Sequence, residues 1–126
     1  MNPRTYFTDR ELTCRCGCGL LPPIASVERL YALRILWGKP LTINSAARCA
    51  THNRTVGGAN SSSHLPASSR TGLSGGQGFD IRTNNLQEQA ELERLAIQCG
   101  FRGIGRASNF LHIDDANRNN IVVWQY

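Results

Sequence analysis

The stretch Phe110-Leu111-His112-Ile113-Asp114 has the alternation of a half-buried β-strand. Successive strand side chains point to opposite faces, so Leu111 and Ile113 share one face while His112 and Asp114 share the other. The aliphatic face is the natural core face, which directs the His and the Asp together into a cleft or toward solvent. Phe79-Asp80-Ile81 repeats this pattern, with Asp80 opposite its apolar neighbours. Both segments therefore predict strands that present reactive side chains on one face.

Helix signals surround these strands. Thr8 and Glu11 match a capping box that opens a short helix. Residues 23–37 carry apolar side chains at helical spacing and stop at Gly38. Asn84 with Gln87 predicts the N-cap of a second long helix, which runs to residue 99.

Further strands are predicted over residues 41–45, 79–82, 101–104 and 121–124, and residues 46–78 read mostly as loop. Helices and strands that do not alternate strictly predict an α+β fold, with a small antiparallel sheet and helices packed on it. The length of 126 residues fits one domain, residues 1–126.

Composition narrows the partners. The net charge is +5, but its thirteen Arg and one Lys are scattered without a basic run, so no nucleic-acid partner is expected. No apolar run approaches the ~20 residues of a membrane span, so no membrane partner is expected either. Residues 1–12 are mixed polar and charged, which predicts no signal peptide.

The chain has five Cys, an odd number, so internal disulfides would leave at least one of them unpaired. Three lie in Cys14-Arg15-Cys16-Gly17-Cys18, inside a Cys-rich segment of residues 1–21, and the others are Cys49 and Cys99. The cluster could hold a structural metal, form a disulfide or consist of reduced thiols. Zinc knuckles usually have C-x₂-C spacing, so C-x-C-x-C is a weak zinc signal. The interpretation favoured here is structural, with the thiols packing the N-terminal loop.

The chain has three His: His52, His64 and His112. Two imidazoles and one carboxylate make a competent catalytic zinc set, because three protein ligands leave a fourth position for water. From residue types alone, structural or surface histidines are the favoured interpretation of His64 and His112.

An ordered series of motifs favours the metal-ligand interpretation of His64 and His112. It comprises Cys14-Arg15-Cys16-Gly17-Cys18-Gly19, Asn44-Ser45-Ala46-Ala47-Arg48-Cys49, His52-Asn53, Val56-Gly57-Gly58-Ala59, Ser62-Ser63-His64, Phe79-Asp80-Ile81 and Phe110-Leu111-His112-Ile113-Asp114. Together they resemble the family of zinc D-Ala-D-Ala carboxypeptidases and phage endolysins over nearly the whole chain. The resemblance implies an α+β fold shared with the signalling domain of hedgehog proteins, and Zn²⁺ bound by His64, Asp80 and His112.

The resemblance also suggests substrate-binding residues. Arg48 matches an Arg that holds a substrate carboxylate, a task suited to a planar guanidinium that binds bidentately. A structural salt bridge is the alternative for Arg48. His52 could contact substrate, or it could bridge the turn over residues 48–53. Trp37, Trp124 and Tyr126 are interpreted as core and sheet-edge packing.

Two features depart from the family pattern. His64 and Asp80 are sixteen residues apart, wider than usual, so residues 65–78 form an inserted Ser/Gly-rich loop. Such an insertion is tolerated because loop-closure entropy grows slowly with length; it could shape the cleft or form a disordered flap. Many relatives carry an acid as general base three residues before the last His, where this chain has Asn109.

Asp114 is the favoured substitute base, because strand alternation places it on the His112 face. Its competing role is to orient a ligand imidazole by binding the free ring nitrogen. Asp115 is a third choice, on the opposite face of a regular strand.

The resemblance implies a peptidase that hydrolyses D-Ala-containing bonds of peptidoglycan stem peptides, as a D,D-carboxypeptidase or an endopeptidase. It further implies a monomeric phage or prophage lytic protein, made in the cytoplasm and acting on the cell wall after release or within a phage particle. The alternative is a catalytically weak or inactive zinc-containing module that binds the wall or belongs to a virion.

Overall fold

The computed structural model describes residues 6–126; residues 1–5, the start of the predicted Cys-rich segment, lie outside the described residues. The helices are α1 (Asp9–Leu12), α2 (Ile24–Trp37), α3 (Ala50–Thr55) and α4 (Leu86–Gln98), with a 3-10 turn η2 (Ala67–Ser69). The strands are β1 (Ile43–Ser45), β2 (Gly78–Arg82), β3 (Gly103–Arg106), β4 (Phe110–Asp114) and β5 (Val122–Gln125). No helix among these residues is long and apolar enough to cross a membrane.

The predicted α+β fold is confirmed, with one refinement at the sheet edge. The strand order is β1-β2-β4-β3-β5. The pairs β1/β2, β2/β4 and β3/β4 are antiparallel, whereas β5 pairs with β3 in parallel. The last strand therefore runs beside β3 in the same direction, with Trp124 opposite Gly105 and its ring beside that of His112.

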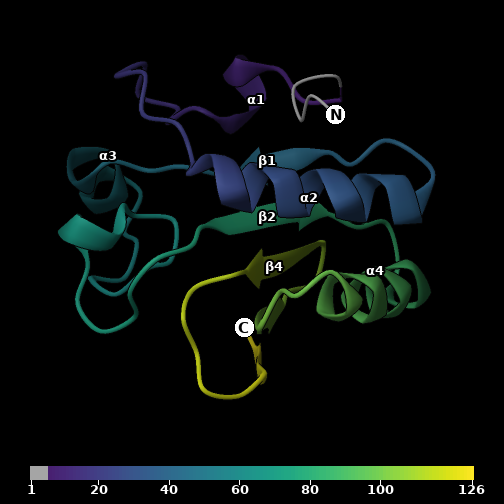
Figure 1. The fold of residues 1–126 in the computed structure, drawn as a ribbon. Coiled ribbons are helices and arrows are strands. Elements are labelled where there is room, and N and C mark those ends of the chain that lie inside the picture. Colours follow the sequence, from purple (N-terminus) through teal and green to yellow (C-terminus); the bar gives the residue numbers. More distant parts are fainter. Residues whose placement is uncertain (1–5) are drawn as a thin grey trace.

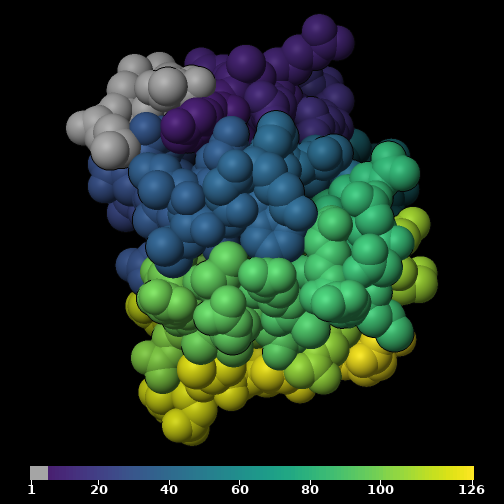
Figure 2. Space-filling model, turned by 90° about the vertical axis from the view of Figure 1, so that its right-hand side faces the viewer, coloured from purple at the N-terminus to yellow at the C-terminus, as the bar shows by residue number. Residues whose placement is uncertain are grey.

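One face of the sheet is buried under helices. Helices α2 and α4 lie in front of the strands in Figure 1, and α1 packs at the β1 side. The core combines helix residues with the alternate strand residues that the sequence predicts, namely Leu30, Leu33, Leu92, Phe79, Ile81, Leu111 and Ile113. Figure 2 shows the N-terminal segment at one end of the molecule and C-terminal residues at the other. Because the helices cover one face of the sheet, the opposite face is left for polar side chains.

Local signals place the helix ends. The Thr8–Glu11 capping box is present, and α2 ends at Gly38 in the left-handed conformation (φ 77°). The predicted N-cap of α4 is wrong by one residue. Asn85, not Asn84, caps the helix, and its Oδ1 accepts from the Glu88 N–H at 2.7 Å.

The segment 46–78 contains a helix that the sequence pattern does not reveal. Helix α3 has no apolar periodicity, and its N-cap is Cys49, whose sulfur accepts from the His52 N–H at 3.4 Å. Cys is not among the residues that ordinarily mark a helix start. This explains why the segment reads as loop.

The loop of residues 65–78, predicted to be an insertion, is held in place by the buried guanidinium of Arg70. The Arg70 guanidinium donates to the carbonyls of Ser63 and Leu65 (both 2.9 Å), of Leu73 (3.0 Å) and of Gly75. Because these hydrogen bonds connect the loop to Ser63, the residue before His64, the loop is an ordered part of the fold and not the disordered flap of the alternative prediction.

Replacing Arg70 with alanine is expected to destabilise the protein by about 2–3 kcal/mol, because buried carbonyls lose a charged donor. Urea unfolding would measure the change, and limited proteolysis should then cut within residues 65–78. Arg94→Ala is the matched control, since Arg94 is exposed and its ion pair with Glu91 is long, at 3.9 Å. Equal stability of the two variants would contradict the anchoring role.

Candidate metal centre

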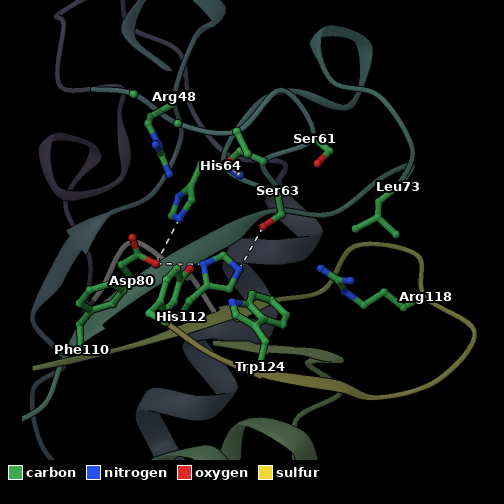
Figure 3. A pocket seen from close by; sticks show the side chains of 15 residues that line it. Arg48, Ser61, Ser63, His64, Leu73, Asp80, Phe110, His112, Arg118 and Trp124 are labelled. Carbon is green, nitrogen blue, oxygen red and sulfur yellow. Dashed lines mark hydrogen bonds and ion pairs between the residues drawn. The ribbon is translucent and has the colours of Figure 1, made fainter. Parts of the chain in front are cut away.

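Three side chains from distant parts of the sequence meet on the sheet face that the helices do not cover. The β2/β4 register places Asp80 directly opposite His112. The segment before His64 is joined to the start of β2, because the Gly78 N–H donates to the Ser63 carbonyl at 2.8 Å. Asp80 Oδ1 lies 3.2 Å from His64 Nε2 and 2.9 Å from His112 Nδ1 (Figure 3). The predicted trio therefore converges on one point.

The His64 ring has a defined tautomer. Its Nδ1–H donates to the Ala46 carbonyl at 2.7 Å, which can only accept. Burial lowers the pKa of His64, so the ring is neutral and Nε2 carries a lone pair. This nitrogen is buried and makes no hydrogen bond, yet it faces a carboxylate oxygen that also only accepts. A cation between Nε2 and Asp80 would satisfy both atoms.

The His112 ring is held from its far side. Nε2 donates to Asp114 Oδ2 at 2.9 Å, and Arg118 donates to the same carboxylate at 3.0 and 2.8 Å. Burial would raise the pKa of Asp114, but His112 and Arg118 hold it well below its usual range. The carboxylate is therefore ionised and keeps the proton on Nε2, which turns Nδ1 toward Asp80.

Electrostatics at the convergence point favour a positive charge. Burial alone would raise the pKa of Asp80, but the hydrogen bond to His112 and the nearby imidazole of His64 lower it strongly. Burial likewise opposes the charging of His112, yet Asp114 and Asp80 raise its pKa overall. The lowered pKa of Asp80 and the raised pKa of His112 therefore both favour positive charge at this point.

The ligand atoms have spacings that suit a small metal ion. Bonds of about 2.0–2.1 Å in a tetrahedron place ligand atoms roughly 3.3 Å apart, close to the separations at Asp80. His64, Asp80 and His112 form one of the potential metal-binding groups among residues 6–126. The orphaned Nε2 of His64 and the spacing together show that these residues fit a metal ion.

A pocket of about 560 Å³ opens over the three side chains. Its other lining residues include Arg48, Ser63, Leu73, Arg118, Trp124 and Tyr126. Within the described chain, the Arg48 guanidinium makes no ion pair, and its Nε is buried without a hydrogen-bond partner. In Figure 3 the Arg48 side chain extends toward His64, while Trp124 and Arg118 lie beyond His112. The pocket thus combines a potential metal centre with a cation available to a ligand.

The profile of a family described as Peptidase M15 matches residues 5–114. The chain belongs to the peptidase M15 family. No curated protein matches the chain, and no solved structure matches it. M15 membership implies the hedgehog/DD-peptidase fold, in agreement with the α+β architecture, and confirms the resemblance that the motifs indicate. The matched range contains the whole His64, Asp80 and His112 trio.

Several residues of this M15 chain lie outside the pocket. His52 is on α3 and is not among the pocket-lining residues; its backbone helps cap that helix. Asn109 is exposed and lines a separate hollow with Asn44. Asp115 accepts from Ser26 Oγ at 3.0 Å and from the Gln77 N–H at 2.7 Å, so it joins α2 to the sheet.

Trp124 lies on the edge strand β5 and packs against Tyr126 in this M15 chain, as the interpretation of sheet-edge packing expects, and both side chains also line the pocket. The Trp124 ring centroid is 5.3 Å from that of His112. Gly105 pairs with His112 on one side and with Trp124 on the other, and a Cβ there would collide with the indole. The glycine at this strand position was the available sequence signal. Trp37, by contrast, packs against the core as predicted.

Proposed function

We propose that this M15 chain is a zinc-dependent peptidase that hydrolyses D-Ala-containing peptide bonds of bacterial peptidoglycan. The observation that carries the proposal is the convergence of His64, Asp80 and His112 in a pocket that also presents the unpaired guanidinium of Arg48. A metal-activated water attacks the scissile carbonyl in such a hydrolysis, and a guanidinium can bind the carboxylate of a substrate that ends in D-Ala.

Zinc is the proposed metal because two imidazole nitrogens and one carboxylate oxygen form a ligand set of known catalytic zinc sites. Zinc bound there would supply Lewis acidity and a water of lowered pKa. The protein contributes ligand orientation, since the Ala46 carbonyl holds His64 and Asp114 holds His112. These outer contacts keep both lone pairs directed to one point.

Arg48 is the proposed anchor for a substrate carboxylate. Burial lowers the pKa of its guanidinium and Asp80 raises it, but an Arg side chain stays protonated in proteins. Gly58 lies against this side chain, and a Cβ there would approach Arg48 within 2.8 Å. A charge fixed beside the metal centre favours substrates with a free carboxylate near the scissile bond, as in a D,D-carboxypeptidase.

Arg48→Lys is expected to reduce kcat/KM about tenfold on a peptide ending in D-Ala, because one charge-assisted hydrogen bond worth about 1.5 kcal/mol is lost. The C-terminal amide of the same peptide is the matched substrate, and its hydrolysis should change little. Steady-state kinetics on both peptides measure the difference. An equal loss on acid and amide would show that Arg48 does not bind the carboxylate.

A second candidate function is supported by the carboxylates near the metal centre, because none of those described is well placed to act as general base. Asp114 is fully buried behind His112, which favours its orienting role over proton transfer in the pocket. Among the described residues that line the pocket, Asp80 is the sole carboxylate, and it is a proposed ligand. A zinc-containing wall-binding module with weak or no activity is therefore the alternative.

Digestion of purified peptidoglycan separates the two candidates. The peptidase proposal expects released D-Ala or cleaved cross-links by mass spectrometry, and no product with a His64→Ala/His112→Ala variant. Bound metal with wall binding but no product would favour the binding module. The phage setting and action on the wall after release remain predictions of the resemblance; lysis of cells from outside and from within would test them.

A further inference from the structure

Four cysteine sulfurs form a second cluster in the structure. One of the four residues, Cys49, directly follows Arg48 in the sequence. Cys14, Cys16 and Cys18 come from the loop after α1, and Cys49 comes from the N-cap of α3. Their sulfurs all lie within 4.8 Å of one another. The fifth, Cys99, follows α4 and does not belong to this group.

The sulfur separations match metal coordination rather than disulfide bonding. They are 3.4 Å for Cys14–Cys16, 3.8 Å for Cys14–Cys49 and 3.7 Å for Cys16–Cys49. A disulfide requires about 2.05 Å. Four sulfurs around a zinc ion at about 2.3 Å form a tetrahedron whose edges are roughly 3.8 Å.

The backbone is arranged to hold four thiolates. Gly17 and Gly19 have φ values of 86° and 84°, a conformation that side chains disfavour, and they turn the loop between and after the closely spaced Cys. The Cys49 N–H donates to Cys14 Sγ at 3.4 Å, and the His52 N–H donates to Cys49 Sγ at the same distance. Such N–H···S bonds offset the negative charge of metal-bound thiolates.

We propose that Cys14, Cys16, Cys18 and Cys49 bind a structural Zn²⁺ ion, separate from the His64 centre. Four sulfur ligands close the coordination sphere, as in structural rather than catalytic zinc sites. The spacing C-x-C-x-C is a weak zinc signal by itself. It becomes a site only when the fold adds Cys49, which lies thirty-one residues after Cys18 in the sequence.

A zinc ion at this site would hold the N-terminal segment against Cys49, which directly follows Arg48 in the sequence. Backbone bonds already join these parts, because the Ala47 N–H donates to the Leu12 carbonyl at 3.3 Å and the Arg48 N–H donates to the His64 carbonyl at 2.8 Å. A Cys₄ zinc site would lock the residue after Arg48. The inference does not depend on the proposed peptidase activity.

Zinc content and zinc K-edge absorption of purified full-length variants test this site. His64→Ala/His112→Ala keeps all the thiols, so it should retain about one Zn²⁺ per chain with a shell of sulfur alone at about 2.3 Å. Cys16→Ser/Cys18→Ser should lose one Zn²⁺ relative to wild type and keep only nitrogen and oxygen neighbours. Cys99→Ser is the matched control and should retain the wild-type zinc content.

Two results would overturn the proposal. One is a His64→Ala/His112→Ala protein, folded by circular dichroism, that contains no zinc or zinc with nitrogen and oxygen neighbours only. The other is an intact mass of the unreduced wild type that shows disulfides among the four Cys. If instead the proposed metal site at His64 is wrong and the Cys site is right, wild type will hold a single zinc ion with sulfur neighbours. That ion will remain in the His64→Ala/His112→Ala variant.

Discussion

His112→Ala is expected to lower kcat/KM on a D-Ala-terminated peptide by about 10³-fold or more. The substitution removes one ligand of the proposed metal and the anchor of Asp114. Metal assistance contributes several kcal/mol to transition-state stabilisation, and each 1.36 kcal/mol is a factor of ten in rate. His64→Ala should have a similar effect, because it too leaves only two of the three proposed ligands. Steady-state kinetics with metal analysis of each variant measure both expectations.

The third histidine provides the control. His52 lies on α3 outside the pocket, so His52→Ala should keep wild-type metal content and nearly wild-type kcat/KM. A loss of activity in His52→Ala as severe as in His112→Ala would contradict the assignment of the centre. So would full activity in either His64→Ala or His112→Ala.

Asp114→Asn is expected to weaken metal binding about 10–100-fold, the usual effect of removing a carboxylate that orients a ligand imidazole. The amide has nearly the shape of the carboxylate but lacks the charge that faces His112 and Arg118. At saturating zinc, kcat should return close to the wild-type value, because no proton-transfer group has been removed. Metal titration and kinetics at rising zinc concentration measure the two quantities.

The same variant decides between the two roles of Asp114. If Asp114 were the general base, metal affinity would stay unchanged and kcat would fall by about 10²–10⁴-fold even at saturating zinc. Asp115→Asn is the matched control, since that neighbouring carboxylate binds Ser26, Gln77 and Arg29 instead of His112. Asp115→Asn should affect stability while leaving metal affinity unchanged.

Strand alternation was sufficient to predict which face carries the chemistry. Phe79, Ile81, Leu111 and Ile113 are buried in the core, and Asp80 and His112 consequently face the pocket. Alternation is local, so it could not show that Asp80 and His112 are direct cross-strand partners. The contribution of His64 was also inaccessible to periodicity, because it comes from a loop; only the resemblance to a known family indicated it.

Features that depend on distant pairing were missed. Trp124 reaches the pocket because β5 runs parallel to β3 and Gly105 leaves room for its indole. Cys49 joins the other thiols because the segment before α3 crosses beside the N-terminal loop. Neither arrangement has a signature in the spacing of nearby residues. The shift of the α4 cap from Asn84 to Asn85 is smaller, since both residues can cap a helix and only backbone geometry selects one.

The most direct test is the metal dependence of peptide release from purified peptidoglycan. Protein stripped by a chelator, with metal removal verified, should release no product, and added Zn²⁺ should restore release by wild type but not by His64→Ala/His112→Ala. That result would establish a metal-dependent peptidase at this centre. Undiminished release of the same products by the stripped wild-type protein would contradict the account.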